Sequence, residues 1–546
     1  MSGREFDHDV IVAGAGPVGL TLTIDLGRRG VRAMIMERDP TTAPWPKMDR
    51  SNARTMEIYR RLGIVDRVRA LGYPADNPMD VILAHKAAGP LIAKQKYPSV
   101  AERRRQIAEC RDGTFPLEPY QLVAQNHIEP LLRQVAEHET ANTTVRYGLE
   151  LIDFEQDGDG VTVFARTLDG KDETFRCRYL VGTDGGTSTV RRRLGVRLHG
   201  RAALNETRQV IFWSEDLYEK MGQTIGKGRH YQFVDGPGVN SLIAQGDRKE
   251  FSAGSALPPD TDFLPLLREM IGFDCEITIR HVNSWRPHLL LAERYQDRRV
   301  FMAGDAIHLV IPTGGLGMNS GVGDAIDLSW KLAGAVHGWG GPALLESYEQ
   351  ERRSVGARNI EASGWAADGS TISGAGITQQ ALREPPDSPA HRRMVETYMV
   401  ELARMHNMVG AETNYSYAGS PLVAYEPGNV PIWELNRIVP HGRPGVRIPH
   451  MWLKDGRALQ DVLGFDYTYL DLRGDCASDG IAAAFAKIGA PLSVVRMDEP
   501  ALREIYNGAV FLLRPDLHIA WRGDAAPEDP GAVARMATGH GPRFRR

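Results

Sequence analysis

The segment HDVIVAGAGPVGLTLTIDLGRRGVRAMIMER, close to the N-terminus, restricts the fold more than any other part of the sequence. A short β-branched run leads into a glycine-rich turn, and a helix-like stretch follows that ends near Gly30. A second apolar run, from Val31 to Met36, stops at Glu37. This succession of strand, helix and strand predicts a β-α-β unit.

The glycines of the turn occupy the positions of a G-x-G-x-x-G motif. Gly14 permits the tight turn, Gly16 lets the backbone approach a pyrophosphate, and Gly19 lets the helix pack on the strand. The helix N-terminus beyond them offers N–H groups and a partial positive charge to phosphates. A plain strand-turn-helix is the alternative. We assign a dinucleotide site to Gly14, Gly16, Pro17, Val18, Gly19, Glu37 and Arg38, with the Glu37 carboxylate positioned for ribose hydroxyls.

Composition excludes several classes of protein. Hydrophobic residues make up 42% and charged residues 25% of the 546 residues, which is typical of a globular chain with a large core. The net charge of -4 gives no general electrostatic reason to bind nucleic acid or a membrane. No apolar run of about 18 residues indicates a membrane-spanning helix. We therefore expect a small organic partner.

The cysteines and histidines predict neither a metal site nor a redox site. The four cysteines lie far apart and include no C-x-x-C pair. No pair of histidines has the spacing of metal ligands, so we expect no metal. Free thiols fit a reducing compartment, which predicts a cytoplasmic protein.

The rest of the chain divides into segments of different pattern. Residues 145–180 are typical of a strand meander, and residues 208–286 are again rich in β patterns. The pattern over 320–366 is helical, and we interpret its charged run, YEQERRSVGARNIEAS, as a solvated helix face. A stretch rich in Gly, Ser and Pro over 370–389 is the best linker candidate. Strand-like and helical segments then alternate, which predicts a last, small α/β domain.

Two further motifs follow apolar strands. In YLVGTDGGTSTVRRRLGV, an Asp184-Gly185 turn precedes a helix start. In RRVFMAGDAIHLVIPTGGLGMNSGVGDAIDLSWKL, a strand ends at Gly304-Asp305 and a glycine loop opens a long helix. The Asp305 carboxylate can bond ribityl hydroxyls, and the amides of residues 314–319 can face a flavin ring and a pyrophosphate.

These motifs give the sequence a clear resemblance to a known family. GAGPVG, GTDGGTSTVR and AGDAIHLVIPTGGLGMNSGVGDA are similar, in order and separation, to the three fingerprints of the FAD-dependent aromatic hydroxylases of the p-hydroxybenzoate and phenol hydroxylase type. The resemblance covers roughly Asp7 to Ala366. The C-terminal part resembles the thioredoxin-like domain of the longer members, and it lacks C-x-x-C, so thioredoxin-type redox activity is not expected.

The resemblance implies an α/β fold (α+β overall) with a Rossmann-like FAD-binding domain, a β-sheet substrate domain and a C-terminal thioredoxin-like domain. The expected boundaries are 1–80, 121–205 and 284–370 for the discontinuous FAD-binding domain, 81–120 and 206–283 for the substrate domain, 371–413 for a linker and helical segment, and 414–546 for the thioredoxin-like domain.

The resemblance also assigns residues to the cofactor. Glu37 would bind the adenosine ribose, and Asp305 the ribityl chain. Gln125, in QNHIEPLL, would touch the FAD or lie on the surface. Asp184 and Arg191 would link flavin binding to the nicotinamide reductant, although a turn and its helix cap explain them equally well. The residues implied around the flavin are Pro312, Gly315, Leu316, Gly317, Met318 and Asn319.

Two residues are candidates for catalysis. Asp49 occupies the position at which phenol hydroxylase carries an aspartate that contacts the substrate hydroxyl. A carboxylate there can take or hold the phenolic proton, which activates the ring towards electrophilic oxygen. The alternative is an ion pair with Arg50 or Arg54. Tyr231, in GRHYQFV, is a candidate pocket residue, and a core aromatic residue is its alternative.

The resemblance implies an FAD- and NAD(P)H-dependent monooxygenase that hydroxylates a phenolic substrate with O2 through a flavin C4a-hydroperoxide. FAD would bind non-covalently, and NADPH or NADH transiently, since only one full G-x-G-x-x-G is present. The alternatives are a flavin-dependent halogenase, a ketone-oxygenating enzyme of the same fold, or a non-catalytic flavin-binding scaffold. The sequence leaves open the phenol, the choice of NADH or NADPH, and the oligomeric state, although homodimers are common in the family.

Overall fold

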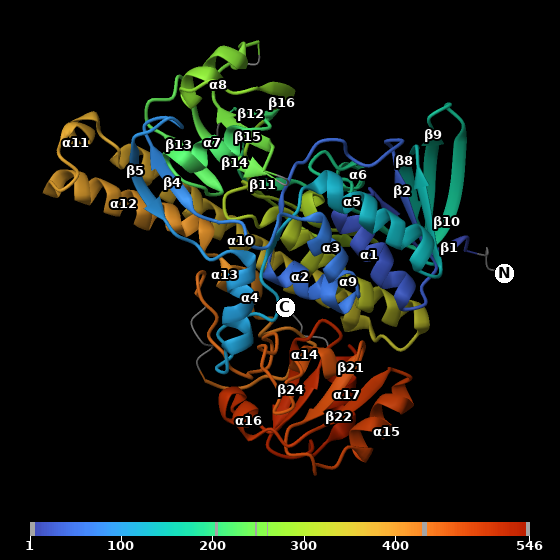
Figure 1. Cartoon of the computed structure of the whole chain (residues 1–546). Helices are drawn as coiled ribbons and strands as arrows, with labels where there is room; N and C mark the ends of the chain where they lie inside the picture. The colour runs from blue at the N-terminus through green and yellow to red at the C-terminus, as the bar shows by residue number, and fades with distance from the viewer. Residues whose placement is uncertain (1–5, 203–205, 246–247, 259, 429–433, 542–546) are drawn as a thin grey trace.

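The computed structural model of the chain describes residues 6–202, 206–245, 248–258, 260–428 and 434–541. In Figure 1 a sheet with its helices lies to the right, a second sheet at the upper left, and a C-terminal α/β unit at the bottom. Strands and helices alternate along most of the chain, which confirms the expected α/β class. The domain boundary expected at residue 205 lies outside the described residues.

The main sheet has eight strands and contains the predicted β-α-β unit. β1 (His8–Ala13) is parallel to both β2 (Ala33–Glu37) and β10 (Asp172–Gly182), and α1 (Pro17–Arg28) connects β1 to β2. The other strands are β7 (Thr143–Tyr147), β8 (Leu149–Gln156), β9 (Val161–Thr167), β18 (Gln296–Asp297) and β19 (Val300–Met302).

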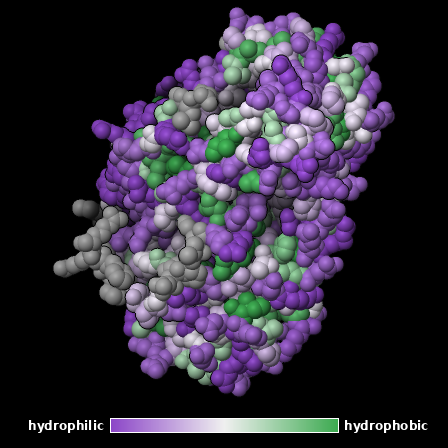
Figure 2. All heavy atoms as spheres, turned by 90° about the vertical axis from the view of Figure 1, so that its left-hand side faces the viewer, coloured by the Kyte–Doolittle hydropathy of each residue, from purple (hydrophilic) through white to green (hydrophobic). Residues whose placement is uncertain are grey.

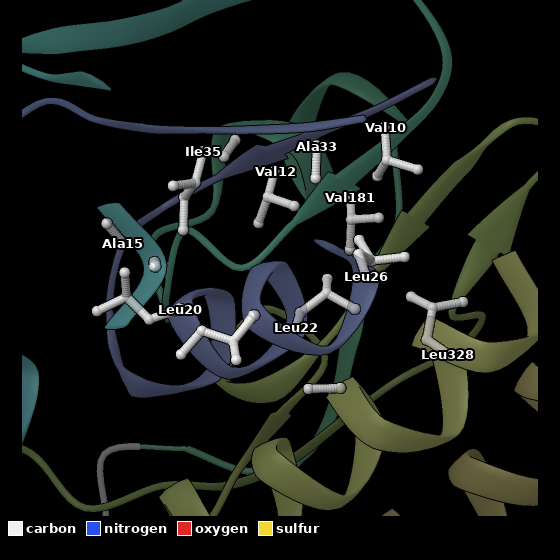
Figure 3. Packing of buried hydrophobic residues seen from close by; sticks show 14 of the residues in the cluster. Val10, Val12, Ala15, Leu20, Leu22, Leu26, Ala33, Ile35, Val181 and Leu328 are labelled. Atoms are coloured by element: carbon white, nitrogen blue, oxygen red, sulfur yellow. The ribbon is translucent and has the colours of Figure 1, made fainter. Parts of the chain in front are cut away.

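Aliphatic side chains pack α1 on the main sheet. Figure 3 shows Leu22 and Leu26 of α1 below the strands that carry Val10 and Val12, and Leu20 at the start of the helix. All five side chains are fully buried, and burial of each is worth roughly 1.5–3 kcal/mol. This packing fixes the start of α1 relative to the end of β1, where the glycine turn lies.

Two long helices extend this layer. α9 (Gly317–His337) packs against α1, and α10 (Pro342–Gly376) packs against α9. The shorter helices of the first two hundred residues are α2 (Ala53–Arg61), α3 (Val65–Leu71), α4 (Val100–Glu109), α5 (Gln125–Gln134), the π-helical turn Val135–Glu139 and α6 (Thr189–Arg193).

The second sheet has seven strands from two separate stretches of chain. Its members are β4 (Val81–Ala84), β5 (Leu91–Gln95), β12 (Thr207–Trp213), β13 (His230–Phe233), β14 (Val239–Gln245), β15 (Glu250–Ser255) and β16 (Thr278–Trp285). Side chains of α7 (Leu217–Thr224) and α8 (Phe263–Ile271) form one hydrophobic core with this sheet. The stretches agree with the expected substrate domain, whose boundaries stay a prediction.

Two small ladders connect the sheets. β3 (Arg50–Ser51) pairs with β6 (Gln121–Leu122), and β17 (Leu289–Ala292) pairs with β11 (Leu198–Arg201) and β20 (His308–Leu309). Figure 2 views the side of the molecule that carries the second sheet, where hydrophobic side chains form separate patches on a largely hydrophilic surface.

The expected linker and helical segment, 371–413, is largely helical. α10 continues to Gly376, and α11 (Gln379–Arg383), α12 (Pro389–His406) and α13 (Val409–Thr413) follow. A Cβ atom at Gly369 would lie 2.5 Å from the backbone oxygen of Glu401 in α12. The segment expected to be a linker is therefore mostly helical, and Gly369, just before it, lets α10 and α12 approach closely.

The C-terminal domain contains a mixed four-stranded sheet. β21 (Tyr467–Asp471) is parallel to β22 (Leu492–Arg496) and antiparallel to β23 (Val510–Leu513), which pairs with β24 (Ile519–Gly523). Its helices are α14 (Leu459–Val462), α15 (Asp479–Ile488), α16 (Pro500–Tyr506) and α17 (Pro530–Ala537). The predicted small α/β domain is confirmed, and its thioredoxin-like assignment stays a prediction.

The charged run on α10 was predicted to be a solvated helix face, and this is only partly correct: Gln350, Arg353 and Glu361 are exposed, whereas Glu351, Arg352 and Arg358 are buried. Glu351 is 1% exposed and accepts hydrogen bonds from Lys331 Nζ (2.6 Å) and from Arg514 Nη1 (2.6 Å). Arg514 comes from the C-terminal domain and also bonds Asp327 of α9 at 3.0 Å. Opposite charges from distant parts of the chain therefore compensate the burial, which the local pattern does not reveal.

Candidate active site

The glycine turn after β1 is fixed by backbone packing. Gly14 has φ +103°, and a Cβ atom there would lie 2.6 Å from the carbonyl oxygen of Thr183. A Cβ atom at Gly19 would lie 2.1 Å from the carbonyl oxygen of Gly14. Contacts this short are not found for real side chains, so the close approach of α1 to the strand ends requires both glycines.

Gly16 differs because its surroundings are open. The nearest atom to a Cβ placed there is Glu129 Oε1, at 4.0 Å. Gly16 is the N-cap of α1, with Pro17 in the first turn and no side chain bonded to the cap. A helix N-terminus without a capping side chain leaves donors for an external anion, and the open position lets that anion reach the backbone.

The first and third fingerprints lie in direct contact. Cβ atoms placed at Gly304 and Gly321 would lie 3.2 and 2.5 Å from Val18 Cγ2. The Gly304-Asp305 turn therefore lies next to the start of α1. Two motifs that are far apart in the sequence form one continuous surface, as a single extended cofactor requires.

The Glu37 carboxylate is held in place at the end of β2. Its Oε2 accepts a hydrogen bond from the Ala15 amide at 2.8 Å, and its Oε1 accepts one from the Asp39 amide at 3.2 Å. Each oxygen retains a lone pair for a ribose hydroxyl. The Arg38 side chain is exposed beside it.

Gln125 and Glu129 connect α5 to the loop before β3. Gln125 Oε1 accepts from the Lys47 amide at 3.2 Å, and its Nε2 donates to Glu129 Oε1 at 2.5 Å. Glu129 Oε2 accepts from the Ala43 amide at 3.0 Å, and burial raises the pKa of this carboxyl. Gln125 is buried rather than on the surface. Glu129 was not assigned to the site, and its place four residues after Gln125 on one helix was the available signal.

Asp305 is exposed, and no donor among the residues that the structure describes bonds its carboxylate. Protein surrounds the group closely on its other sides, and this desolvation raises its pKa. Below the turn, Asp324 Oδ2 accepts from the Gly304 amide at 3.1 Å and bonds His308 Nε2 at 2.7 Å. Asp324 also pairs with Arg352 Nε at 2.7 Å and thus supports the turn from within.

Asn319 connects the predicted flavin loop, residues 312–319, to the β3 segment through hydrogen bonds. Its Nδ2 donates to the carbonyl oxygens of Gly315 (2.6 Å) and Arg50 (2.9 Å), and its Oδ1 accepts from the Asn52 amide at 2.9 Å. Pro312 is exposed, and Leu316 is buried next to Met408. The remaining loop residues, Gly317 and Met318, are half-buried at the start of α9.

The Asp184 carboxylate serves as a cap. It accepts hydrogen bonds from the Ser188 hydroxyl and from the amides of Thr189 (2.6 Å) and Val190 (3.1 Å) at the start of α6. Arg191 donates to the carbonyl oxygens of Ala306 (2.9 Å) and Gly186 (2.7 Å), which links the second fingerprint to the third. Both side chains therefore have structural partners, and their roles towards the cofactor stay predictions.

Asp49 forms an ion pair with a residue that the sequence analysis did not single out. Its Oδ2 accepts from Arg229 Nη2, while the Arg229 Nη1 donates to the carbonyl oxygen of Ala244. The side chain of Arg229 is 3% exposed and that of Asp49 is 28% exposed. The partners considered from sequence are engaged elsewhere, since Arg50 pairs with Glu412 and Arg54 with Glu57.

Tyr231 lies in the core of the second sheet rather than on its open face. It is fully buried, and its hydroxyl oxygen accepts from the Gly228 amide at 2.8 Å. The burial of β13 alternates, so that His230 and Gln232 lie on the less buried face. This arrangement matches the core alternative, and a catalytic role for Tyr231 stays a prediction.

The described residues include no group of three or more His, Cys, Asp or Glu that could hold a metal ion. Among the same residues, no helix combines the length and apolarity needed to cross a membrane. FAD fits the surface that the fingerprints form, because Gly16 is open, the Glu37 carboxylate is held, and the Asp305 carboxylate has no donor.

Comparison with known proteins agrees with this geometry. Residues 7–363 match the family described as FAD binding domain, and residues 441–540 match the aromatic-ring hydroxylase C-terminal family. The FAD-dependent monooxygenase apdD of Emericella nidulans is 31% identical over 97% of this chain and 90% of its own length. Aklavinone 12-hydroxylase RdmE of Streptomyces purpurascens is 31% identical over 96% of this chain and 97% of its own length.

A solved structure of similar fold is the flavin-dependent monooxygenase PieE in complex with FAD and substrate. It superposes with a TM-score of 0.85 at 28% identity, covering 98% of this chain and 100% of that one. The expected family and the expectation of an enzyme are thereby confirmed. This chain is a flavoprotein oxidoreductase and belongs to the FAD binding domain family of FAD-dependent monooxygenases and aromatic hydroxylases.

Proposed function

We propose that the protein hydroxylates a phenolic aromatic substrate, using FAD, O2 and NADPH or NADH. The observation that carries the proposal is the position of Asp49 on the β3 segment. Asn319 of the flavin loop bonds the backbone of Arg50 and Asn52, and Asp49 directly precedes Arg50. The carboxylate is therefore held at a fixed place relative to the loop that would surround the flavin.

The cofactor would be held along the joined fingerprints. Gly16 and the N-terminus of α1 would bind the pyrophosphate, Glu37 the adenosine ribose, and Asp305 the ribityl chain. Once bound and reduced, FAD supplies the activation of O2 for transfer of one oxygen atom to the substrate. Binding without a covalent bond is part of the proposal, as is transient binding of the nicotinamide, since one G-x-G-x-x-G motif is present.

The chain's own residues would prepare the substrate. Asp49 would accept the hydrogen bond of a substrate hydroxyl and draw its proton away, which raises the electron density of the ring. Arg229, buried at 3% exposure, holds Asp49 through one nitrogen and Ala244 through another. This anchoring fixes the direction of the carboxylate, which proton transfer requires. Relatives are named aklavinone 12-hydroxylase and 2,4-dichlorophenol 6-monooxygenase, and we extend the proposal to substituted and polycyclic phenols.

The decisive experiment combines reductant consumption with product analysis. Purified, FAD-loaded protein is mixed with a panel of phenols and polycyclic phenols, and NADH and NADPH oxidation is followed with and without each compound. We expect at least one compound to stimulate oxidation and to gain one oxygen atom that derives from labelled O2. If no compound gains oxygen, hydroxylation is not the activity, and chloride or bromide with the same panel then tests for halogenation.

A further inference from the structure

Two histidines meet near the Asp49–Arg229 pair, where α12 packs on the second sheet. His230 begins β13 and directly follows Arg229, and His406 is the last residue of α12. Their ring centroids lie 4.8 Å apart with an angle of 60° between the ring planes. Tyr97, just after β5, packs its ring 4.9 Å from that of His406. In Figure 1, α12 passes beside β4 and β5 of this sheet, which brings the three segments together.

Both imidazoles contain a nitrogen without a partner. His230 Nδ1 and His406 Nε2 are screened from solvent, and neither has a hydrogen-bond partner among the described residues. As whole residues, His230 and His406 are half-buried. Leaving such an atom unpaired is unfavourable, so each one calls for an explanation.

The two rings are neutral at physiological pH. Burial, followed by the positive charges of Arg50 and Arg229, lowers the pKa of His406 to about 3. The pKa of His230 is lowered as well, by burial and then by His406. A neutral imidazole has one N–H donor and one acceptor nitrogen. Such a pair is suited to an oxygen atom that both donates and accepts a hydrogen bond.

The charges around the rings argue against an anionic ligand. Arg50 is paired with Glu412 at 2.8 Å, and Arg229 is paired with Asp49. Neither cation is therefore left to neutralise a carboxylate or a phosphate at this position. A hydroxyl group that keeps its proton is the oxygen substituent that fits these surroundings.

We propose that His230 and His406 bind a second, un-ionised hydroxyl group of the aromatic substrate, distinct from the hydroxyl at Asp49. The inference rests on the proposed function. It restricts the substrate class to aromatic compounds that carry two or more hydroxyl groups on different sides of the ring system. Tyr97 would pack beside the ring that carries the second hydroxyl.

Ligand binding tests this inference without turnover. The FAD-loaded, oxidised protein is titrated with 2-naphthol, with 1,5-, 1,6-, 2,6- and 2,7-dihydroxynaphthalene, and with 6-hydroxy-2-naphthoate, and Kd is read from the change in flavin absorbance. We expect the best diol to bind about 3- to 10-fold more tightly than 2-naphthol, as one added hydrogen bond allows. We expect the naphthoate to gain no such advantage.

Variants of the two histidines test whether these residues cause the tighter binding of the diol. His230→Phe and His406→Phe keep a ring and remove both nitrogens, so they should abolish the preference for the diol and leave the Kd of 2-naphthol unchanged. His230→Asn and His406→Gln retain a polar group near the Nδ1 and Nε2 positions, respectively, and should restore part of the preference. His85→Phe is the matched control, because His85 is bonded to Asp235 at 2.9 Å, and it should behave as the wild type.

The outcomes separate the two proposals. If no diol is preferred by the wild type, or if the Phe variants keep the preference, the histidines do not bind a substrate hydroxyl. A preference for the naphthoate would assign the site to an anion and overturn the inference. Normal diol selectivity with no oxygen transferred to any compound would contradict the proposed hydroxylation and leave the binding site established. The preference of the wild type needs no variant, so a Phe variant that fails to fold does not remove the test.

Discussion

The glycine turn and the Asp49–Arg229 pair both lie next to the predicted flavin, but their construction differs. In the turn, neighbouring segments hold one another, as when Glu37 accepts a hydrogen bond from Ala15 at 2.8 Å. The pair joins a loop before β3 to the start of β13, and Ala244 of β14 holds the arginine in place. The first site depends on local backbone geometry, whereas the second depends on how two sheets dock.

This difference predicts different responses to mutation. At Gly14 and Gly19 the backbone leaves no room for a larger side chain, whereas at Gly16 a side chain would fit the protein and exclude the cofactor. The pair is a charge contact, so its loss should affect the chemistry first and the cofactor little. Variants at the two sites should therefore differ in whether they impair cofactor binding or oxygen transfer.

The largest effect is expected for Asp49→Asn. If the carboxylate draws the phenolic proton away, the rate of hydroxylation should fall about 10²- to 10⁴-fold, while FAD affinity stays unchanged. Reductant would still be consumed and hydrogen peroxide would accumulate, so the ratio of product to NAD(P)H oxidised measures the effect. Asp235→Asn, at an exposed ion pair of the same sheet, is the control. A wild-type rate with normal coupling would show that Asp49 only serves Arg229.

Gly16→Val should weaken FAD binding by about 100-fold or more, as expected when two backbone hydrogen bonds to a phosphate are lost. The apo protein should keep its melting temperature, because the position is open. Gly19→Val is the contrasting variant, since its side chain would overlap Gly14 and should destabilise the fold itself. Fluorescence titration with FAD and thermal unfolding distinguish the two. Full FAD affinity in Gly16→Val would mean that the pyrophosphate lies elsewhere.

Asp305→Ala should reduce FAD affinity by about 1.5–3 kcal/mol, the value of a hydrogen bond to a charged group. Because the carboxylate has no protein donor among the described residues, the free energy of unfolding of the apo protein should change little. An unchanged Kd for FAD would remove Asp305 from the ribityl site.

Asp184→Ala should show the reverse behaviour. Loss of the bonds to the Thr189 and Val190 amides should cost about 0.5–2 kcal/mol of folding free energy, as for a helix cap. FAD affinity should fall less than in Asp305→Ala. A larger loss of affinity than of stability would favour the predicted role towards the cofactor over the cap.

The smallest effect is expected for Cys476→Ser in the C-terminal domain. Cys476 is buried with a free thiol, and burial raises its pKa, so it is a poor nucleophile at neutral pH. Turnover should stay within about twofold of the wild type and stability within about 1 kcal/mol. A strong loss of turnover in the folded variant would give this domain a redox role.

The sequence was sufficient for the β-α-β unit, because turn, helix and strand all lie within one local motif. It was insufficient for Arg229 and His406, whose partners come from distant segments and leave no local signal. For Tyr231 the sequence left a pocket and a core position open, because the choice depends on which face of β13 packs against α7 and α8. The buried part of the charged run on α10 was missed for the same reason, since Arg514 reaches Glu351 from the C-terminal domain.

The buried Arg514 makes the folding of the rest of the chain depend on the C-terminal domain. Without Arg514, Lys331 would be the one charged side chain among the described residues that donates hydrogen bonds to the buried carboxylates of Asp327 and Glu351. α9, which contains Asp327, begins with the flavin loop. We therefore expect the C-terminal domain and the flavin loop to unfold as one cooperative unit. A chain truncated before the last domain would lose its cofactor, although every predicted cofactor residue precedes the cut.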